Sequence, residues 1–297
     1  MPSWQEFEPF IVSGLALGGV YALSGVGTVV LYQATGVVYL AFGAVGAMGA
    51  LIAWSLTNAG APDWLAWLVC VLFGGAVTLA YGMVFGPPLA RRDPLVKAVA
   101  TLGLTLVLFG LMDLLWTTNG GQSRAITLPT DNGGFTIGQS QVTWTQVIGL
   151  AAGIALVVVT TLFLRYTKLG TAMRAMANDR EITATLGVPV RQVEAAAWLG
   201  CGVIAGVAGL LLADLVALDA TTLTFLVISS LAAALIARLR SITITFVAAL
   251  VIGLIHDLLT PIQALSNYRD MTPFVLAAVA LLVLSRHGVM TASREEA

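Results

Sequence analysis

The chain alternates between long apolar segments and short polar connections. The apolar segments approach the length that a helix needs to cross the hydrocarbon core of a bilayer, about 20 residues. They lie at Phe10–Tyr32, Gly36–Leu56, Trp64–Phe85, Val96–Trp116, Trp144–Leu164, Val193–Ala213, Leu223–Ala237, Ile242–Leu259 and Pro273–Leu284. The pattern predicts an all-α membrane protein, a polytopic helical bundle of eight to nine transmembrane segments that forms a single domain over residues 1–297.

The second apolar segment is rich in glycine. It carries Gly43, Gly46 and Gly49, and glycine weakens a helix. Irregular backbone at membrane depth is tolerated only inside protein or beside a water-filled cavity. The pattern leaves both a broken and a continuous helix open.

Small residues recur at a spacing of four, which lets helix backbones approach closely in lipid. Examples are Gly14 with Gly18, Gly43 with Ala47, and Gly202 with Gly206. A helix face without side chains would alternatively leave room for a solute. No internal repeat is visible in the sequence, although inverted repeats are often too weak to detect in one chain.

Basic residues are unevenly divided between the two sides that alternate threading produces. Arg124 and Arg269 fall on one side, and the other twelve of the 14 Lys and Arg residues fall on the opposite side. Because cytoplasmic loops carry the excess of Lys and Arg, the N-terminus is expected outside and the C-terminus in the cytoplasm. The first apolar segment is too long for a signal-peptide core, so we expect it to be retained.

Residues 166–192 form a polar segment on the predicted cytoplasmic side. Leu169, Ala172, Met173 and Met176 follow the i, i+3, i+4, i+7 spacing of one helical face, and Arg174 points elsewhere. This pattern indicates a short amphipathic helix that either binds a cytoplasmic partner or lies on lipid headgroups. Its length favours the partner, because a plain connection needs only a few residues.

A second short helix is expected directly after the first. Asn178 and Glu181 have the spacing of a capping box, and Ile182 and Leu186 lie one turn apart. Gly187 then supplies a stop signal. The segment therefore has the pattern of a helix, a cap, a second helix and a stop.

Residues 118–143 form the longer loop on the outer side. Asn132, Gly133 and Gly134 lie between short β-prone stretches, which predicts a small hairpin with its turn at these residues. The loop either contacts an extracytoplasmic partner or merely joins two spans.

Composition argues against several classes of function. The chain is 58% hydrophobic and 10% charged, and its net charge of −1 without a basic aromatic surface argues against nucleic acid as a partner. No Walker A motif is present. Cys70 and Cys201 fall inside apolar segments without metal-ligand spacing, so we interpret them as small core residues. No cofactor is expected on this chain.

Charged side chains are almost absent from the middles of the spans. Asp113 and the pair His256–Asp257 lie near the outer ends of two spans. They are either hydrated interface residues or an outer vestibule that meets a polar solute. A coupled ion carrier would need ionisable groups near the midplane, which the sequence lacks.

Two aromatic residues accompany the glycines of the second span. Tyr39, Phe42 and Gly43 are interpreted either as core residues or as the lining of a translocation path.

Four blocks, in this order, are similar to a known family. They are GLALGGVYALSGVGTVVLY at Gly14–Tyr32, RDPLVKAVATLGLTLVLFGL at Arg92–Leu111, GGFTIG at Gly133–Gly138 and LGTAMRAMANDREITATLGVPVRQV at Leu169–Val193, followed by YRD at Tyr268–Asp270 and RHGVM at Arg286–Met290. The chain resembles the smaller permease subunit of the branched-chain amino acid family of bacterial ABC importers. The similarity extends over nearly the whole length.

This resemblance implies a multi-pass protein of the bacterial cytoplasmic (inner) membrane and a division of labour. A heterodimer with a sister permease would form the path, two cytoplasmic ATPases would bind ATP and Mg, and an extracytoplasmic solute-binding protein would deliver the solute. The chain itself would be a transport subunit and not an enzyme. ATPase coupling would then fall to Leu169, Met173, Arg174, Met176, Asn178, Arg180, Glu181, Leu186 and Gly187.

One departure concerns the solute. Many family members carry an Asn-Phe-Ala-His-Gly-like stretch in the second span, where this chain has YLAFG at Tyr39–Gly43. The expected solute is a branched-chain amino acid or a related amino acid, amide or small organic acid. The alternative function is an ion-coupled secondary transporter, and an intramembrane enzyme is a third hypothesis that no nucleophile–base pair supports.

Overall fold

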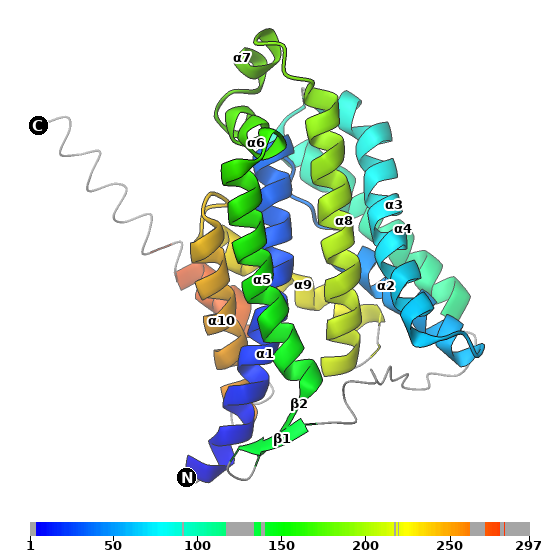
Figure 1. The fold of residues 1–297 in the computed structure, drawn as a ribbon, viewed down its shortest axis with the longest axis vertical. Helices are drawn as coiled ribbons and strands as arrows, with labels where there is room; N and C mark the ends of the chain where they lie inside the picture. The colour runs from blue at the N-terminus through cyan, green and yellow to red at the C-terminus, as the bar shows by residue number, and fades with distance from the viewer. Residues whose placement is uncertain are drawn as a thin grey trace, which may run out of the picture.

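The computed structural model describes residues 4–90, 92–116, 134–137, 140–216, 218, 220–261, 271–279 and 282. The helices are α1 (Trp4–Thr35), α2 (Phe42–Asn58), α3 (Asp63–Leu89), α4 (Pro94–Trp116), α5 (Trp144–Tyr166), α6 (Lys168–Asn178), α7 (Arg180–Thr185), α8 (Val190–Leu215), α9 (Ala220–Ile236) and α10 (Ile242–Leu258). Residues 272–279 are also helical. The long helices stand side by side, with α6 and α7 at one end and a β-hairpin at the other (Figure 1).

The apolar helices lie in the predicted apolar segments, although α1 begins six residues earlier and α2 six residues later than predicted. Within the described residues, five helices are long and apolar enough to cross a membrane: Pro9–Thr35 of α1, and the whole of α3, α4, α5 and α8. Helices α2, α9 and α10 are apolar but shorter, at 17 residues each. The predicted all-α membrane bundle is confirmed.

The chain between α1 and α2 leaves the helical conformation. Gly36 has a φ of +66°, residues 36–39 have no regular secondary structure, and α2 begins only at Phe42. Gly46 and Gly49 lie inside α2. A break in the second apolar segment therefore exists, but it precedes the glycines that suggested it.

The Thr101 side chain of α4 satisfies the backbone at this break. Its hydroxyl oxygen accepts a hydrogen bond from the Leu40 N–H at 3.2 Å and lies 3.0 Å from the Val38 carbonyl oxygen, to which it can donate. Thr101 is fully buried. Because unpaired backbone groups in a membrane are costly, this residue permits non-helical chain inside the bundle.

Glycines lie where the two principal helix pairs cross. A Cβ atom at Gly253 of α10 would overlap the backbone of Gly18 in α1, and one at Gly74 of α3 would overlap the carbonyl oxygen of Gly202 in α8. Only glycine allows such close backbone approach. The predicted packing role of the small residues is therefore confirmed in α1 and α8.

The two halves of the bundle repeat one arrangement in opposite directions. Helices α1, α2 and α3 form one set, and α8, α9 and α10 form the other. The first helix of each set packs on the third helix of the other, α1 on α10 and α8 on α3, and α1 and α8 run in opposite directions (Figure 1). This is an inverted repeat, as in many transporters, which the sequence did not reveal.

A hairpin precedes α5. Strands β1 (Gly134–Ile137) and β2 (Ser140–Thr143) pair antiparallel, with Gly134 opposite Thr143 and Ile137 opposite Ser140. The predicted hairpin is confirmed, but the predicted turn is wrong, because Gly134 is paired in the ladder. The rest of the predicted turn, at 132–133, lies outside the described residues. Thr143 also forms a capping box with Gln146 at the start of α5.

Candidate functional site

The polar segment after α5 folds into the two predicted short helices. Thr167 begins α6 by accepting a hydrogen bond from the Gly170 N–H at 2.9 Å. Gly170 lies directly against the backbone of Leu164 at the end of α5. Helix α6 packs on α1, α5 and α8, so it is anchored to three transmembrane helices.

The apolar face of α6 points into the protein. Met173 and Met176 are only 3% and 6% exposed and belong to the main core cluster, whereas Arg174 is exposed and Leu169 is 40% exposed. The amphipathic helix is confirmed. The prediction that Met173 and Met176 contact a partner directly is wrong, because the chain's own helices already cover them.

Helix α7 is capped by Asp179 and not by Asn178. The Asp179 carboxylate accepts hydrogen bonds from the N–H groups of Glu181 and Ile182, both at 2.9 Å. Asn178 is instead the last residue of α6, and the predicted Asn178–Glu181 capping box is wrong by one position. Gly187 has a φ of +83° and follows the end of α7, as the stop signal predicted.

The second short helix presents apolar side chains to the outside. Ile182 is 60% exposed and Leu186 is 77% exposed, and Glu181 is exposed beside them. Exposed apolar side chains at the polar end of a membrane protein mark a surface for a partner. We call Ile182, Leu186 and Glu181 the α7 surface.

One ion pair connects α7 to the membrane-spanning part. The Arg180 Nη2 atom lies 2.7 Å from Oε1 of Glu194, in the second turn of α8, and Arg180 Nε lies 2.9 Å from the same oxygen. The Glu194 side chain is 14% exposed. The ion pair therefore links α7 directly to α8, so that a displacement of α7 can be transmitted to α8.

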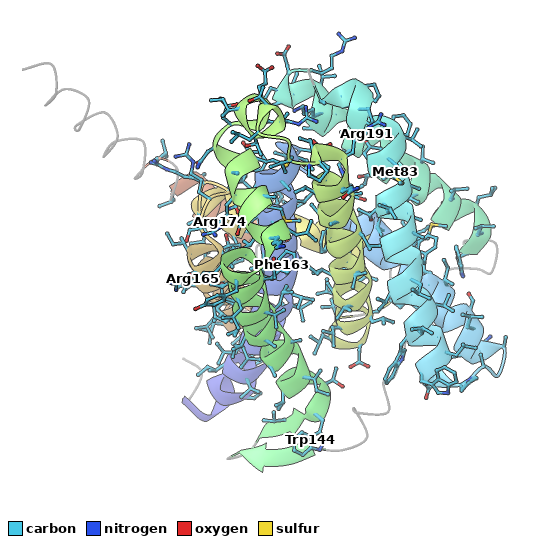
Figure 2. The ribbon with its side chains drawn as sticks, turned by 45° about the horizontal axis from the view of Figure 1, so that its top comes forward. Met83, Trp144, Phe163, Arg165, Arg174 and Arg191 are labelled. Carbon is cyan, nitrogen blue, oxygen red and sulfur yellow. The ribbon has the colours of Figure 1, made fainter. Side chains whose placement is uncertain are left out.

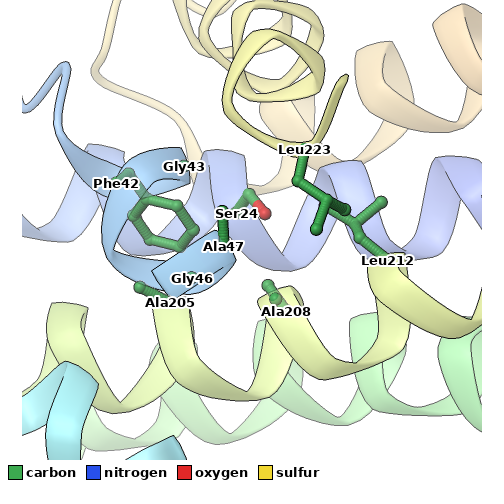
Figure 3. Close-up of a pocket in the computed structure, with 10 residues that line it drawn as sticks. Ser24, Phe42, Gly43, Gly46, Ala47, Ala205, Ala208, Leu212 and Leu223 are labelled. Carbon is green, nitrogen blue, oxygen red and sulfur yellow. The ribbon is translucent and has the colours of Figure 1, made fainter. Parts of the chain in front are cut away.

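A narrow interior pocket lies where α1, α2, α8 and α9 meet. Its volume is only about 10 Å³, so it holds at most about one water molecule. It is lined by Ser24, Phe42, Gly43, Gly46, Ala47, Ala205, Ala208, Gly209, Leu212 and Leu223 (Figure 3). Phe42 and Gly43 open α2, and Leu223 lies in the first turn of α9, so the pocket joins the two short helices of the inverted repeat.

Tyr39 lies in a separate aromatic cluster. It is 1% exposed, its hydroxyl is 3.4 Å from Thr78 Oγ1, and its ring meets the Trp198 ring edge-on with centroids 5.4 Å apart. Tyr81 packs on both rings. Of the two interpretations of Tyr39, the structure supports a core residue. It does not bring Tyr39 to the pocket that Phe42 and Gly43 line.

Within the described residues, the three residues of the predicted outer vestibule do not all lie together. His256 Nδ1 is 3.3 Å from Asp257 Oδ1, and this pair lies in α10 beside Gly14 of α1. Asp113 is exposed near the end of α4, on the other side of the bundle from α10 (Figure 1). Only His256 and Asp257 are therefore neighbours. Cys70 and Cys201 are buried, as predicted for core residues.

Sequence comparison identifies the family to which the chain belongs. A family model described as "Branched-chain amino acid transport system / permease component" matches residues 10–284. The chain belongs to this permease family. It is therefore a transport subunit, a permease of an ABC importer, and a multi-pass protein of the inner membrane.

Individual relatives cover almost all of the permease. The high-affinity branched-chain amino acid transport permease LivH of Escherichia coli K12 is 28% identical over 92% of each chain. The corresponding BraD of Pseudomonas aeruginosa is 25% identical over 95% of each chain. A probable LivH of Methanocaldococcus jannaschii is 26% identical over 85% of this permease and 81% of its own length.

The solved structure titled PsaBC from Streptococcus pneumoniae in complex with Fab has a similar fold. The TM-score is 0.50 at 12% sequence identity, and the similarity covers 93% of this permease and 90% of the matched chain. At this identity the comparison concerns the fold alone.

Proposed function

We propose that this permease forms, with a non-identical sister permease, the path of an importer for a small organic solute. Family membership over residues 10–284 carries the proposal. The solute is a branched-chain amino acid, as the names of the relatives state for those proteins, or a related amino acid, amide or small organic acid. An extracytoplasmic binding protein delivers it, and two cytoplasmic ATPases bind ATP and Mg.

The charge distribution supports an orientation. Figure 2 shows Arg174 and Arg191 towards the end that carries α6 and α7, with Trp144 at the opposite end. Cytoplasmic connections carry the excess of basic residues. We therefore place α6 and α7 in the cytoplasm and the N-terminus outside.

The α7 surface is the proposed contact for an ATPase, in place of the buried methionine face. It combines exposed apolar side chains with the carboxylate of Glu181, and the Arg180–Glu194 pair joins it to α8. Movement of an ATPase would thus shift α8, whose residues line the interior pocket, and so bias one state of the path over another.

Phe42 and Gly43 are the proposed path residues, because they line a pocket between the two short helices. Small residues of α2 and α8, such as Gly46, Ala208 and Gly209, leave room for the pocket to widen if α2 and α9 separate. A modestly hydrophobic solute suits this lining.

Purification from the native host in mild detergent, followed by mass spectrometry of bound proteins, tests the assembly. We expect a second permease and ATPase subunits, with solute uptake into proteoliposomes that depends on ATP. A chain that purifies alone and accumulates solute under an ion gradient without ATP would instead establish the secondary transporter.

A further inference from the structure

Lys97 lies over the start of the break between α1 and α2. It belongs to the first turn of α4 and is partly buried. A Cβ atom on Gly36, the first residue of the break, would stand 3.7 Å from Lys97 Nζ. Thr101 lies one turn further along α4 and bonds the break at Val38 and Leu40. One face of α4 thus carries two side chains that lie against the non-helical chain.

The ammonium of Lys97 also lies at the carboxyl end of α1. This helix has no basic residue in its own last turn, and its last residue, Thr35, is followed directly by Gly36. The unpaired carbonyl groups at the end of a helix carry a partial negative charge, which a nearby cation stabilises. Within the described residues, the ammonium forms no hydrogen bond or ion pair. It is therefore held there by weak electrostatic attraction and remains available to another partner.

The competing partner is the ion pair between α7 and α8. The charge of Lys97 interacts with both members of this pair, because Arg180 repels it and Glu194 attracts it. Glu194 already accepts two hydrogen bonds from Arg180, at 2.9 and 2.7 Å. Two cations from different helices therefore compete for one carboxylate, whose side chain is only 14% exposed and so is weakly screened by water.

From this arrangement we infer that Lys97 is a positioning residue that transmits movement of α7 to the break before α2. While Arg180 holds Glu194, the ammonium of Lys97 stays over Gly36. When α7 is displaced and Arg180 leaves, Glu194 attracts Lys97 away from the break. The inference rests on the proposed function, because it takes ATP-driven transport and the ATPase contact at α7 as given.

Release of the break reaches the proposed path residues directly. The break ends where α2 begins, and the first two residues of α2 are Phe42 and Gly43, which line the interior pocket. Lysine suits such an exchange, because its ammonium sits on a flexible four-carbon chain and needs no fixed geometry. The attraction of a cation to a helix end and its attraction to a partly exposed carboxylate are similar in size. A small displacement of Arg180 therefore decides which of the two Lys97 prefers.

Cysteine labelling of the break in the purified transporter tests the inference. Val38→Cys places a thiol in the break, and Cys70 and Cys201 are buried, so a maleimide reports chiefly on position 38. With Lys97 present, we expect the labelling rate to differ by roughly 2- to 30-fold between the ATP–vanadate-trapped and nucleotide-free states. Lys97→Met keeps the length of the side chain but removes its charge, and it should label at the faster rate in both states.

Two further variants control this measurement. Lys97→Arg keeps the charge and should retain most of the difference between the two states. Lys168→Met removes the only other lysine of the chain, an exposed residue of α6, and should label as the wild type does. A full difference in Lys97→Met, or none with Lys97 present, would overturn the inference. A purified transporter that hydrolyses no ATP would refute the proposed function, and the coupling role with it.

Thermal unfolding of the purified transporter in detergent tests the exchange of partners without ATP. With Arg180→Gln, Lys97 remains as the cation that attracts Glu194, so Lys97→Met should lower the melting temperature more in this background than in the wild type. Arg174→Gln removes an exposed arginine of α6 and is the matched background, in which the effect of Lys97→Met should not grow. An equal loss in the Arg180→Gln and wild-type backgrounds would show that Glu194 does not attract Lys97 in place of Arg180, and would overturn the inference.

Discussion

Arg180 of α7 and Glu194 of α8 form an ion pair in which Nη2 lies 2.7 Å from Oε1. The pair joins the outermost helix of the polar segment to a membrane-spanning helix. Arg180 is 38% exposed, so water screens the attraction and its contribution to stability is about 1 kcal/mol or less. Its proposed importance is mechanical, because it links the α7 surface to α8.

Reversing one charge should uncouple the transporter without unfolding it. Arg180→Glu places two carboxylates together, and we expect solute uptake to fall several-fold while expression and melting temperature change little. The double variant Arg180→Glu/Glu194→Arg restores the pair and should recover most of the uptake. Uptake per ATP hydrolysed, measured in proteoliposomes, checks this. The control Arg191→Glu changes an exposed arginine nearby, and a similar defect there would contradict the specific role of the pair.

Replacing an exposed apolar residue of the polar segment with aspartate should have a different effect from replacing a buried one. Ile182→Asp/Leu186→Asp should leave the permease folded but release the ATPase, because both side chains are exposed. Met173→Asp should instead destabilise the fold by several kcal/mol, since it buries a carboxylate in the core. Pull-down of the ATPase together with thermal unfolding in detergent separates the two effects. Retention of the ATPase by the α7 double variant would refute the assignment of the α7 surface.

The hydroxyl of Thr101 should be essential to the break before α2. Thr101→Val keeps the shape but leaves the Leu40 N–H without its bond, at a cost of about 1–3 kcal/mol. Thr105→Val is the matched control, because the Thr105 hydroxyl donates to the Thr101 carbonyl oxygen of its own helix, at 3.2 Å. Thermal unfolding of both variants in detergent compares them. Equal small losses would mean that the break does not need Thr101.

Close backbone approach should make Gly74 intolerant of any side chain. Gly74→Ala drives a Cβ atom into the carbonyl oxygen of Gly202 and should cost about 1–3 kcal/mol or prevent folding. Gly103 of α4 has open space around it, so Gly103→Ala should stabilise the helix by up to about 1 kcal/mol. The yield of monodisperse protein and its melting temperature provide the comparison.

Alanine variants of the two aromatic residues, Phe42 and Tyr39, should differ in which property they change. Phe42→Ala enlarges the interior pocket and should change the KM for solute uptake, with an assembled complex still present. Tyr39→Ala removes a ring from the aromatic cluster and should chiefly lower stability, by about 3 kcal/mol or more. Uptake kinetics and unfolding, measured on the same preparations, distinguish path from core. Unchanged kinetics in Phe42→Ala would remove this residue from the path.

Local chemistry explains what could be predicted along the chain. A membrane span requires only a sufficient apolar length, so the sequence predicts each apolar helix, although the starts of α1 and α2 differ from the predicted ones by six residues. Gly187 ended α7 as predicted, because a positive φ angle is a local property that glycine adopts readily. The cap of α7 was misplaced by one residue, since Asn178 and Asp179 are both good caps and only the path of the chain selects between them.

Side-chain periodicity predicts that α6 has an apolar face, but it does not determine which residues cover that face. Met173 and Met176 are covered by helices distant in sequence, and Thr101 reaches a backbone break some 60 positions earlier. Such contacts depend on how the helices are arranged. The inverted repeat was hidden for the same reason, because apolar packing constrains size and shape far more than residue identity.

The sequence by itself thus determined that the protein is a helical membrane bundle, where its apolar helices lie, and which polar segment carries a helix pair. Each of these depends on neighbours in the chain. Only the tertiary structure decided that Ile182 and Leu186 are exposed while Met173 is buried, that Phe42 and Tyr39 occupy separate sites, and that Arg180 meets Glu194. Those relationships arise from packing between distant helices, which no local pattern encodes.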